Sequence, residues 1–213
     1  MVCRPGQTFR HMTNEAEVVA MTMMTMKAGV AALTMACALV VAAVPALAGD
    51  GFRLTSTDLA DGRIGRDHVL SADYGFGCDG GNQSPQLSWQ GAPSGTRSFV
   101  LTLHDPDAPT GIGWTHWVVA NIPADAGSLP RGAAGDPAML PDGALQTRTD
   151  FGAPGYGGPC PPEGSAHRYV FTLTALAVDH LPPVTADAMP ALVGFLAGAN
   201  ALGTARLEAR YGR

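Results

Sequence analysis

Apolar and polar residues alternate along several short stretches of the chain, all of them after residue 51. A period of two places the apolar side chains on one face of a β-strand. In residues 168–178, for example, Tyr169, Phe171, Leu173 and Ala175 share one face. Gly, Pro, Asp and Asn cluster between the stretches, as they do in turns. The pattern predicts strands over residues 52–57, 86–89, 98–105, 115–123, 168–178 and 201–213.

Two other segments interrupt this run of strands. Residues 185–200 favour a helix with Thr185 as its N-cap, although Pro190 could move the start. The segment between Pro123 and Arg168 is rich in Gly, Pro and Asp and predicts a long loop, which in a compact domain is usually functional or disordered. We therefore predict a mostly β protein, a single-domain antiparallel β-sandwich with one or two short helices.

Residues 26–48 have a different character from the rest of the chain. Lys27 precedes an unbroken apolar run, and the segment ends in the small residues Ala46-Leu47-Ala48. This arrangement is typical of a secretory signal peptide cleaved after Ala48. The alternative, a membrane anchor, is disfavoured because the run is short for a span of ~20 residues. We expect residues 1–25 to be an upstream extension and residues 49–213 to be the mature, exported domain, periplasmic or secreted.

Composition narrows the function further. The net charge is −5, only 15% of residues are charged, and Lys27 is the single lysine. Nucleic-acid binding is excluded, because phosphate backbones are held mainly by Lys and Arg. After signal cleavage the chain keeps two cysteines, Cys78 and Cys160. A pair in an exported protein is consistent with a disulfide, although two free thiols remain an alternative.

Acids and histidines collect at the ends of predicted strands. Asp105 and Asp107 follow residues 98–105 in a corner made rigid by prolines, His116 begins the next strand, and His167 begins the strand after the long loop. Should these strands be neighbours, their ends would meet at one edge of the sheet. Each residue alone is more often a turn former or a filler, and His68, His104 and His180 have weaker cases still.

Three separated motifs then match a known family. The stretches "DPDAP" (105–109), "WTHWVVANIP" (114–123) and "GYGGPCPPEGSAHRYVFTL" (155–173) occur in order, and "CDGGNQSPQLSW" (78–89) fits as well. Together they resemble the phosphatidylethanolamine-binding protein (PEBP) family, in its bacterial Raf-kinase-inhibitor-like branch. The resemblance covers nearly all of the chain from residue 52 onwards.

The resemblance implies a large antiparallel β-sandwich with a small anion-binding pocket at one end. Its ligand-binding residues would be Asp105, Asp107, Trp114, His116, Gly158, Pro161, His167 and Tyr169. It also implies a cis peptide bond before Pro109, and a Cys78–Cys160 disulfide would staple the pocket rim. Because two histidines stand near two aspartates, we expect their pKa values to be raised, so that imidazolium groups could hold a phosphate oxygen.

Three functions remain open at this point. The first is an exported, non-enzymatic binding protein for a phosphate-bearing or zwitterionic head group, with a role as inhibitor or modulator of a partner protein. The second is a hydrolase using the Asp/His cluster, against which the chain lacks "GxSxG" and "HExxH" motifs. The third is a secreted interaction module with a vestigial pocket. No catalytic residue, metal or cofactor is expected under the first interpretation.

Overall fold

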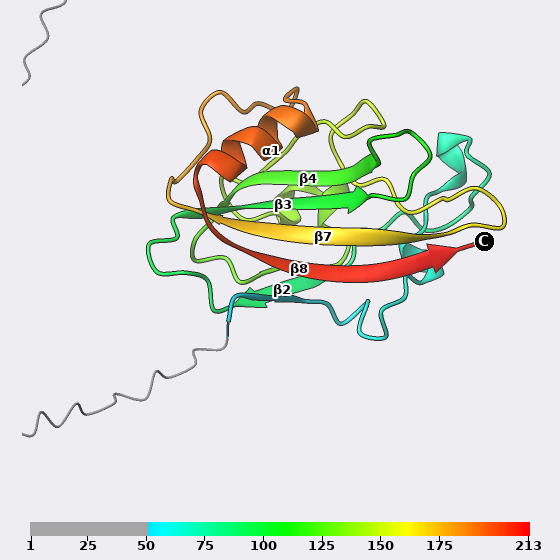
Figure 1. The fold of residues 1–213 in the computed structure, drawn as a ribbon, viewed down its shortest axis with the longest axis horizontal. Coiled ribbons are helices and arrows are strands. Elements are labelled where there is room, and N and C mark those ends of the chain that lie inside the picture. Colours follow the sequence, from blue (N-terminus) through cyan, green and yellow to red (C-terminus); the bar gives the residue numbers. More distant parts are fainter. Residues whose placement is uncertain (1–50) are drawn as a thin grey trace, which may run out of the picture. The chain divides into compact units, whose positions relative to one another are not determined.

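Two antiparallel sheets face each other in the computed structural model, which describes residues 51–213 (Figure 1). The smaller sheet has the order β1-β2-β5, with β1 Arg53–Thr55, β2 Leu87–Gln90 and β5 Ser128–Leu129. The larger has the order β6-β4-β3-β7-β8, with β3 Ser98–Asp105, β4 Trp114–Pro123, β6 Leu145–Gln146, β7 Ala166–Leu176 and β8 Ala201–Gly212. The predicted antiparallel sandwich is confirmed. The expected extension at 1–25 and signal at 26–48 lie outside the described residues.

The main core fills the space between the two sheets. Strand β7 presents Tyr169, Phe171, Leu173 and Ala175 to it, all fully buried, as the alternation predicts. Leu87 and Trp89 of the smaller sheet pack from the opposite side. Burial of such side chains contributes ~1.5–3 kcal/mol each, so this face fixes the register of the sheet.

The helix is shorter than predicted. Helix α1 spans Pro190–Ala199, and its N-cap is Met189 without a side-chain hydrogen bond. The prediction of Thr185 as N-cap is therefore wrong. Proline has no N–H and a fixed φ, both of which suit the first helical turn, so Pro190 sets the start.

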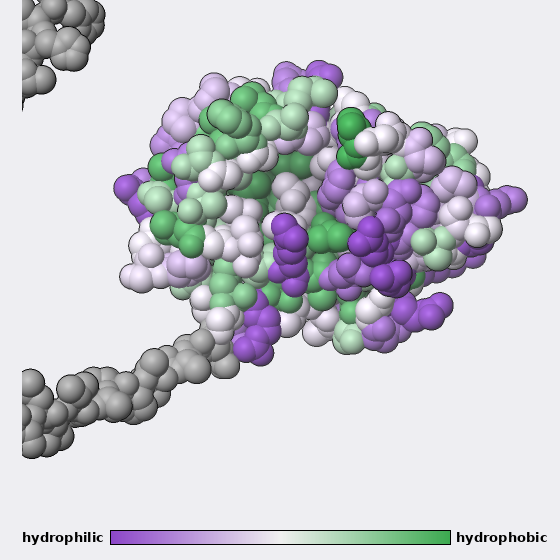
Figure 2. Space-filling model, in the orientation of Figure 1, coloured by the Kyte–Doolittle hydropathy of each residue, from purple (hydrophilic) through white to green (hydrophobic). Residues whose placement is uncertain are grey.

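Helix α1 covers one end of the outer face of the larger sheet, at the upper left in Figure 1. Its Val193 and Ala197 are buried in a second apolar cluster with Val100, Val118 and Leu176 of the strands. The other side of the helix leaves Phe195 74% exposed. Figure 2 shows apolar surface gathered over this helix, whereas polar surface predominates at the right-hand end of the sheet.

The segment between Pro123 and Arg168 is not one continuous loop. It contains β5, β6 and two short 3₁₀-helices, η3 Ala133–Gly135 and η4 Pro137–Met139. Two more, η1 Arg66–His68 and η2 Ala72–Tyr74, lie in the loops before β2. Within residues 51–213, no helix is long and apolar enough to cross a membrane.

Candidate functional site

Three neighbouring strands bring the predicted site residues to one end of the sandwich. In the order β4-β3-β7, Asp105 at the end of β3 pairs with Trp114 at the start of β4. Strand β7 begins beside them, because it runs antiparallel to β3. Asp105, His116 and His167 therefore meet at one edge, as expected if the strands were neighbours.

A pocket of about 210 Å³ opens at this edge. It is smaller than the pockets that enclose drug-sized ligands, so it suits a small chemical group. Its walls come from the strand ends and from the three loops around them. The lining residues are Leu70, Phe76, Asp105, Ala108, Pro109, Thr110, Trp114, His116, Phe151, Gly158, Cys160, Pro161, Pro162, His167 and Tyr169. Seven of the eight residues predicted to bind a ligand are among them; Asp107 is the exception.

Asp105 and His167 form a buried pair at the base of the pocket. His167 Nδ1 lies 2.7 Å from Asp105 Oδ2, and the two side chains are 8% and 4% exposed. The other carboxylate oxygen accepts the backbone N–H of Asp107 at 2.8 Å. A carboxylate accepts at both oxygens, so Nδ1 of His167 carries a hydrogen and its Nε2 is left for a ligand.

The Asp107 carboxylate is directed away from the pocket, onto an arginine. Its Oδ2 accepts from Arg168 Nε and backbone N, both at 2.9 Å, and its Oδ1 accepts from Arg168 Nη2 at 2.6 Å. These bonds hold the pKa of the Asp107 carboxyl well below its usual range. We expected both acids to line the pocket mouth, but only Asp105 does so. The corner after β3 turns the Asp107 side chain outward, toward Arg168 of β7.

His116 is buried and neutral, contrary to the expectation of a raised pKa. Burial is the largest cause and lowers the pKa of His116 to about 4, even though the nearby Asp105 opposes the shift. The free-energy cost of desolvating a charged imidazole exceeds the favourable interaction of that charge with one carboxylate at a distance. Nδ1 of His116 lies 2.7 Å from the backbone oxygen of Gly157.

Several buried polar atoms at the pocket lack a partner. Among the described residues, five buried side-chain N or O atoms make no hydrogen bond, and three belong to pocket-lining residues: Trp114 Nε1, His116 Nε2 and Tyr169 Oη. Burial and the charge of Asp105 also raise the pKa of Tyr169, so its hydroxyl keeps its proton. Unpaired buried polar groups cost ~1–3 kcal/mol each, so three of them on residues that line one cavity make this cavity the candidate ligand site.

The floor of the pocket depends on backbone approach that only glycine permits. A Cβ at Gly158 would lie 2.3 Å from the backbone oxygen of His68, and one at Gly157 would lie 2.3 Å from the Phe151 ring. Asn82 fixes the same segment from below, donating to the Tyr156 oxygen at 3.1 Å and accepting from Gly158 N at 2.8 Å. These contacts position Gly157 O, which in turn orients His116.

A disulfide and the C-terminal arginine hold the rim together. Cys78 and Cys160 form the predicted disulfide, across a sequence separation of 82. Arg213 donates to backbone oxygens of both loops: Nε to Pro161 at 2.6 Å, Nη1 to Gly77 at 2.8 Å and Nη2 to Phe76 at 3.2 Å. This role of Arg213 could not be predicted from the sequence, because no local pattern links residue 213 to residues 76 and 161.

The expected cis peptide bond before Pro109 is absent. Within residues 51–213 the cis bond lies at Pro182–Pro183, and Ala108–Pro109 is trans. The corner before β4 is closed instead by Thr110, whose hydroxyl donates to the Gly113 oxygen at 2.6 Å. Pro109 still lines the pocket.

Phe151 is a pocket residue that sequence reasoning did not single out. Its ring makes edge contacts with four other rings, those of Tyr74, Phe76, Trp114 and His116, at centroid separations of 5.1–6.1 Å. Its position, as an aromatic residue in the glycine-rich stretch 151–164, could have indicated this role in the sequence. Phe151 makes the wall beside His116 apolar.

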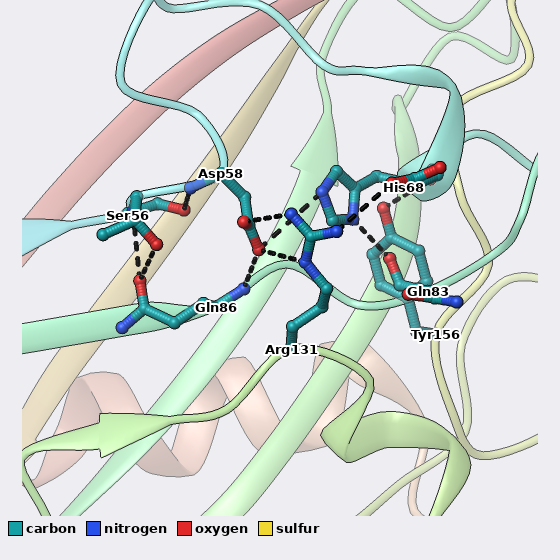
Figure 3. Close-up of polar contacts among 9 residues, drawn as sticks. Ser56, Asp58, His68, Gln83, Gln86, Arg131 and Tyr156 are labelled. Carbon is teal, nitrogen blue, oxygen red and sulfur yellow. Dashed lines mark hydrogen bonds and ion pairs between the residues drawn. The ribbon is translucent and has the colours of Figure 1, made fainter.

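The other histidines within residues 51–213 lie outside the pocket. Figure 3 shows His68 beside a polar cluster in which Arg131 Nε donates to Asp58 Oδ2 at 3.1 Å, and Gln86 N donates to the same oxygen at 2.8 Å. Arg131 lowers the pKa of Asp58, and His68 Nε2 stands 3.8 Å from that carboxylate. The Tyr156 hydroxyl donates to the His68 oxygen at 2.8 Å, so this cluster braces the pocket floor from behind.

His104 and His180 occupy still more peripheral positions. His104 Nδ1 lies 3.4 Å from the Thr115 hydroxyl, on the side of β3 away from the core, and His180 is exposed. In the part of the chain that the structure describes, no group of three or more His, Cys, Asp and Glu side chains is placed to hold a metal ion.

The fold and the site together define a class of protein: a β-sandwich with a small, mostly apolar pocket at the ends of its central strands. The phosphatidylethanolamine-binding protein family model matches residues 62–212. The chain belongs to this family, as its three motifs indicated.

Comparisons with individual proteins support this family assignment. The chain is 48% identical over 160 residues to the UPF0098 protein YbhB of Escherichia coli, covering 75% of this chain and 99% of that protein. It is similar to the crystal structure of Escherichia coli YbcL, described as a new member of the mammalian PEBP family, with a TM-score of 0.72, 46% identity and coverage of 76% and 98%. The PEBP homologue CT736 of Chlamydia trachomatis matches with a TM-score of 0.63 and 29% identity, again covering 76% and 98%.

Proposed function

We propose that the protein is an exported binding protein whose pocket holds a phosphate-bearing or zwitterionic head group. The observation that carries this proposal is that three residues lining a single cavity, Trp114, His116 and Tyr169, each have a buried polar atom without a hydrogen-bond partner. Two of them, the indole N–H and the tyrosine O–H, are donors suited to ligand oxygens. Membership of the PEBP family supports the same ligand class.

The chemistry of the pocket favours binding over catalysis. The Asp105–His167 pair has the geometry of a base with its orienting group. A nucleophile for it is not supplied by the lining residues: the Thr110 hydroxyl is bonded to the Gly113 oxygen, and Cys160 is in the disulfide. The lining residues therefore do not support covalent catalysis, and we propose binding as the function of the pocket.

Modulation of a partner protein fits the shape of the rim. Phe76 lines the pocket and is 53% exposed, and Ile112, in the loop between β3 and β4, is 85% exposed. A partner that packs on these side chains would contact the part of the protein that a bound head group changes. The ligand would thus alter the affinity for the partner.

Export is supported by two features of the chain. Residues 26–48 have the pattern of a signal peptide. Disulfides such as Cys78–Cys160 form and persist mainly in oxidising compartments outside the cytoplasm.

The test of the binding proposal is a titration with phosphoethanolamine, followed by NMR at the indole N–H of Trp114. We expect a saturable shift in the wild-type domain and at least tenfold weaker binding in His116→Ala, because the variant removes a polar atom that faces the ligand. His180→Ala, at an exposed position away from the pocket, should bind like the wild type. Absence of any shift in the wild type would overturn the proposal.

A further inference from the structure

Helix α1 leaves an apolar face exposed at the surface of the described chain. Met189 and Leu192 are 55% and 40% exposed, Phe195 is 74% exposed, and Leu202, just after the helix, is 41% exposed. The sequence of Pro190–Ala199 contains no charged residue. The resulting apolar surface is visible over the helix in Figure 2. Contiguous exposed apolar surface of this kind marks interaction sites.

This α1 face has a ridge and a trough beside each other. Successive residues of an α-helix are rotated by about 100°, so Phe195 projects on the side opposite the buried Val193 and Ala197. Gly194 and Gly198 lie one turn apart, on one side of Phe195. A Cβ placed at either glycine would meet no described atom within 4 Å, apart from the backbone of the helix itself. The space over the two glycines is therefore open.

The two glycines of α1 have no structural reason within the described chain. Glycine is a weaker helix former than alanine, and neither Gly194 nor Gly198 has a positive φ. Glycine inside an element commonly permits the close approach of another backbone. Such an approach exists at Gly158, where a Cβ would lie 2.3 Å from the His68 oxygen, but none exists at α1 among the described residues. The trough therefore has room for a segment of another molecule.

We infer that helix α1 is the contact face of a weak homodimer of this chain. In this dimer the α1 helices of two copies run in opposite directions about a two-fold axis. Phe195 of each copy occupies the trough over Gly194 and Gly198 of the other, as ridges of one helix fill the grooves of another in packed helix pairs. A partner for this face must bring both a projecting ring and a trough. A second copy brings both on one surface, which is what a two-fold interface requires.

The charges at the two ends of α1 are complementary in this arrangement. The Asp187 side chain, just before the helix, is 81% exposed and forms an ion pair with Arg148. The Arg97 side chain, at the entry to β3 and beside the other end of the helix, is 58% exposed and forms an ion pair with Asp179. Antiparallel helices would bring Asp187 of one copy toward Arg97 of the other. Opposite charges placed in this way favour association and fix its orientation.

A lipid surface fits the α1 face less well than a second copy does. Helices that lie on anionic membranes carry Lys and Arg beside their apolar face. Helix α1 contains no basic residue, and an acid stands near each of its ends, Asp187 and Asp179. The face therefore offers a membrane no net positive charge.

The size of the α1 face predicts a dimer that dissociates on dilution. Its exposed side chains and the flanking ion pairs offer about 500 Å² per copy, whereas a stable interface buries ~800 Å² per partner. The dimer should therefore form in concentrated solution, and the monomer should predominate when the protein is dilute.

The dimer would leave both pockets open. Helix α1 packs on Val100 and Leu176, at one end of β3 and β7, whereas Asp105 and His167 lie at the opposite end of the same strands. Dimerisation should not change the affinity of a pocket for a small ligand, and the inference does not depend on the proposed function. Two open pockets in one particle would strengthen attachment to a surface that displays many ligands.

The experiment is sedimentation velocity on the domain of residues 49–213, with the disulfide intact, from about 5 μM to about 1 mM. We expect the average mass of the wild type to rise from monomer toward dimer over this range. Phe195→Glu should raise the Kd of the dimer at least tenfold, because it places a charge in the contact. The matched control is Ile112→Glu, which changes an apolar side chain that is 85% exposed in the loop between β3 and β4. This control should dimerise like the wild type.

A second variant separates a lost contact from a damaged fold. Alanine at both Gly194 and Gly198 would fill the trough while improving the helix propensity of α1. We expect the double variant to raise the Kd of the dimer about fivefold or more. Its midpoint of thermal unfolding, measured on dilute protein, should equal or exceed that of the wild type.

Four results would overturn the inference and leave the proposed function standing. The first is a wild type that stays monomeric at every concentration, and the second is a Phe195→Glu variant that dimerises like the wild type. The third is loss of the dimer in Ile112→Glu with retention in Phe195→Glu, which would place the interface on the pocket rim. The fourth is unchanged dimerisation of the double alanine variant, which would show that the trough is not filled.

Discussion

At the scale of single residues, the two acids of the "DPD" corner have different partners. Asp105 is 3% exposed and bonded to His167 inside the pocket, whereas the Asp107 side chain is 30% exposed and bonded to Arg168 on the surface. A ligand in the cavity would meet Asp105 and not Asp107. Under the proposed function, Asp105 would serve binding and Asp107 would serve the structure of the corner, although the two acids are only two positions apart.

Substitution of each acid by its amide should reveal this difference. We expect Asp105→Asn to weaken phosphoethanolamine binding at least tenfold, because His167 loses the carboxylate that orients it. Asp107→Asn should change the affinity less than twofold, in the same NMR titration. A loss of binding in Asp107→Asn comparable to that in Asp105→Asn would show that the corner acts as one unit.

The Asp107–Arg168 pair should also contribute to stability in a pH-dependent way. Arg168 lowers the pKa of Asp107 in the folded protein, so the stabilisation is complete above the unfolded pKa of ~4 and is lost as the pH falls below it. Because both side chains are partly exposed, at 41% and 30%, we expect ~1 kcal/mol or less. Urea unfolding of Asp107→Asn should show that deficit at pH 7 and a smaller one at pH 3.

At the scale of elements, α1 has two apolar faces with different surroundings. Val193 is fully buried against the outer face of the larger sheet, whereas Phe195, two residues further on, is 74% exposed. The helix sequence does not distinguish Val193 from Phe195, because both residues are apolar. They differ because only Val193 packs against β3, β4 and β7.

Alanine at the two positions should therefore have opposite outcomes. We expect Val193→Ala to lower the free energy of unfolding by ~1–3 kcal/mol, because it leaves a cavity under the helix. Phe195→Ala should stay within ~0.5 kcal/mol of the wild type, as surface substitutions do. Chemical denaturation of both variants measures this, and a large loss in Phe195→Ala would show that its face is covered in solution.

At the scale of the whole molecule, the disulfide joins the two loops that Arg213 also bridges. The 82-residue separation between Cys78 and Cys160 makes a large ring, for which the loss of chain entropy in the unfolded state contributes up to ~4 kcal/mol. Both crosslinks lie at the pocket end. If the protein is exported and binds as proposed, oxidation of this one disulfide would connect the two properties.

The mass of protein isolated from the cell envelope should reveal both signal cleavage and disulfide formation. We expect the intact mass of a chain that begins at Gly49, and we expect this mass to increase by two hydrogens on reduction. Reduction should also lower the midpoint of thermal unfolding, with Cys78→Ala/Cys160→Ala as the matched control that no longer responds to reductant. An N-terminus at Met1 or Met26 in the envelope fraction would contradict signal cleavage.

The alternation of apolar residues was sufficient to predict six strands, because a period of two leaves one buried face and one register; the two-residue strands β5 and β6, inside the segment predicted as a loop, are too short to show such a period. It placed 98–105, 115–123, 168–178 and 201–213 close to their observed bounds. The helix start was less certain, since Thr185 and Pro190 are both plausible starts by local rules, and the packing of Val193 and Ala197 on the sheet accompanies the later one. The motifs identified the family and seven of the lining residues.

Other features depended on partners that are distant in the sequence. Arg168 binds the outward-turned Asp107, and Arg213 holds the rim through the Pro161 oxygen. Phe151 forms the wall beside His116. Proximity of charges in the sequence predicted a protonated His116, but its burial among β4, β7 and the Gly157 loop keeps it neutral. The sequence by itself determined the sheets and which residues gather at their ends, because strand periodicity is local. Tertiary structure alone decided protonation, pairing and the direction of each side chain, because desolvation and hydrogen bonding depend on every segment packed around the group.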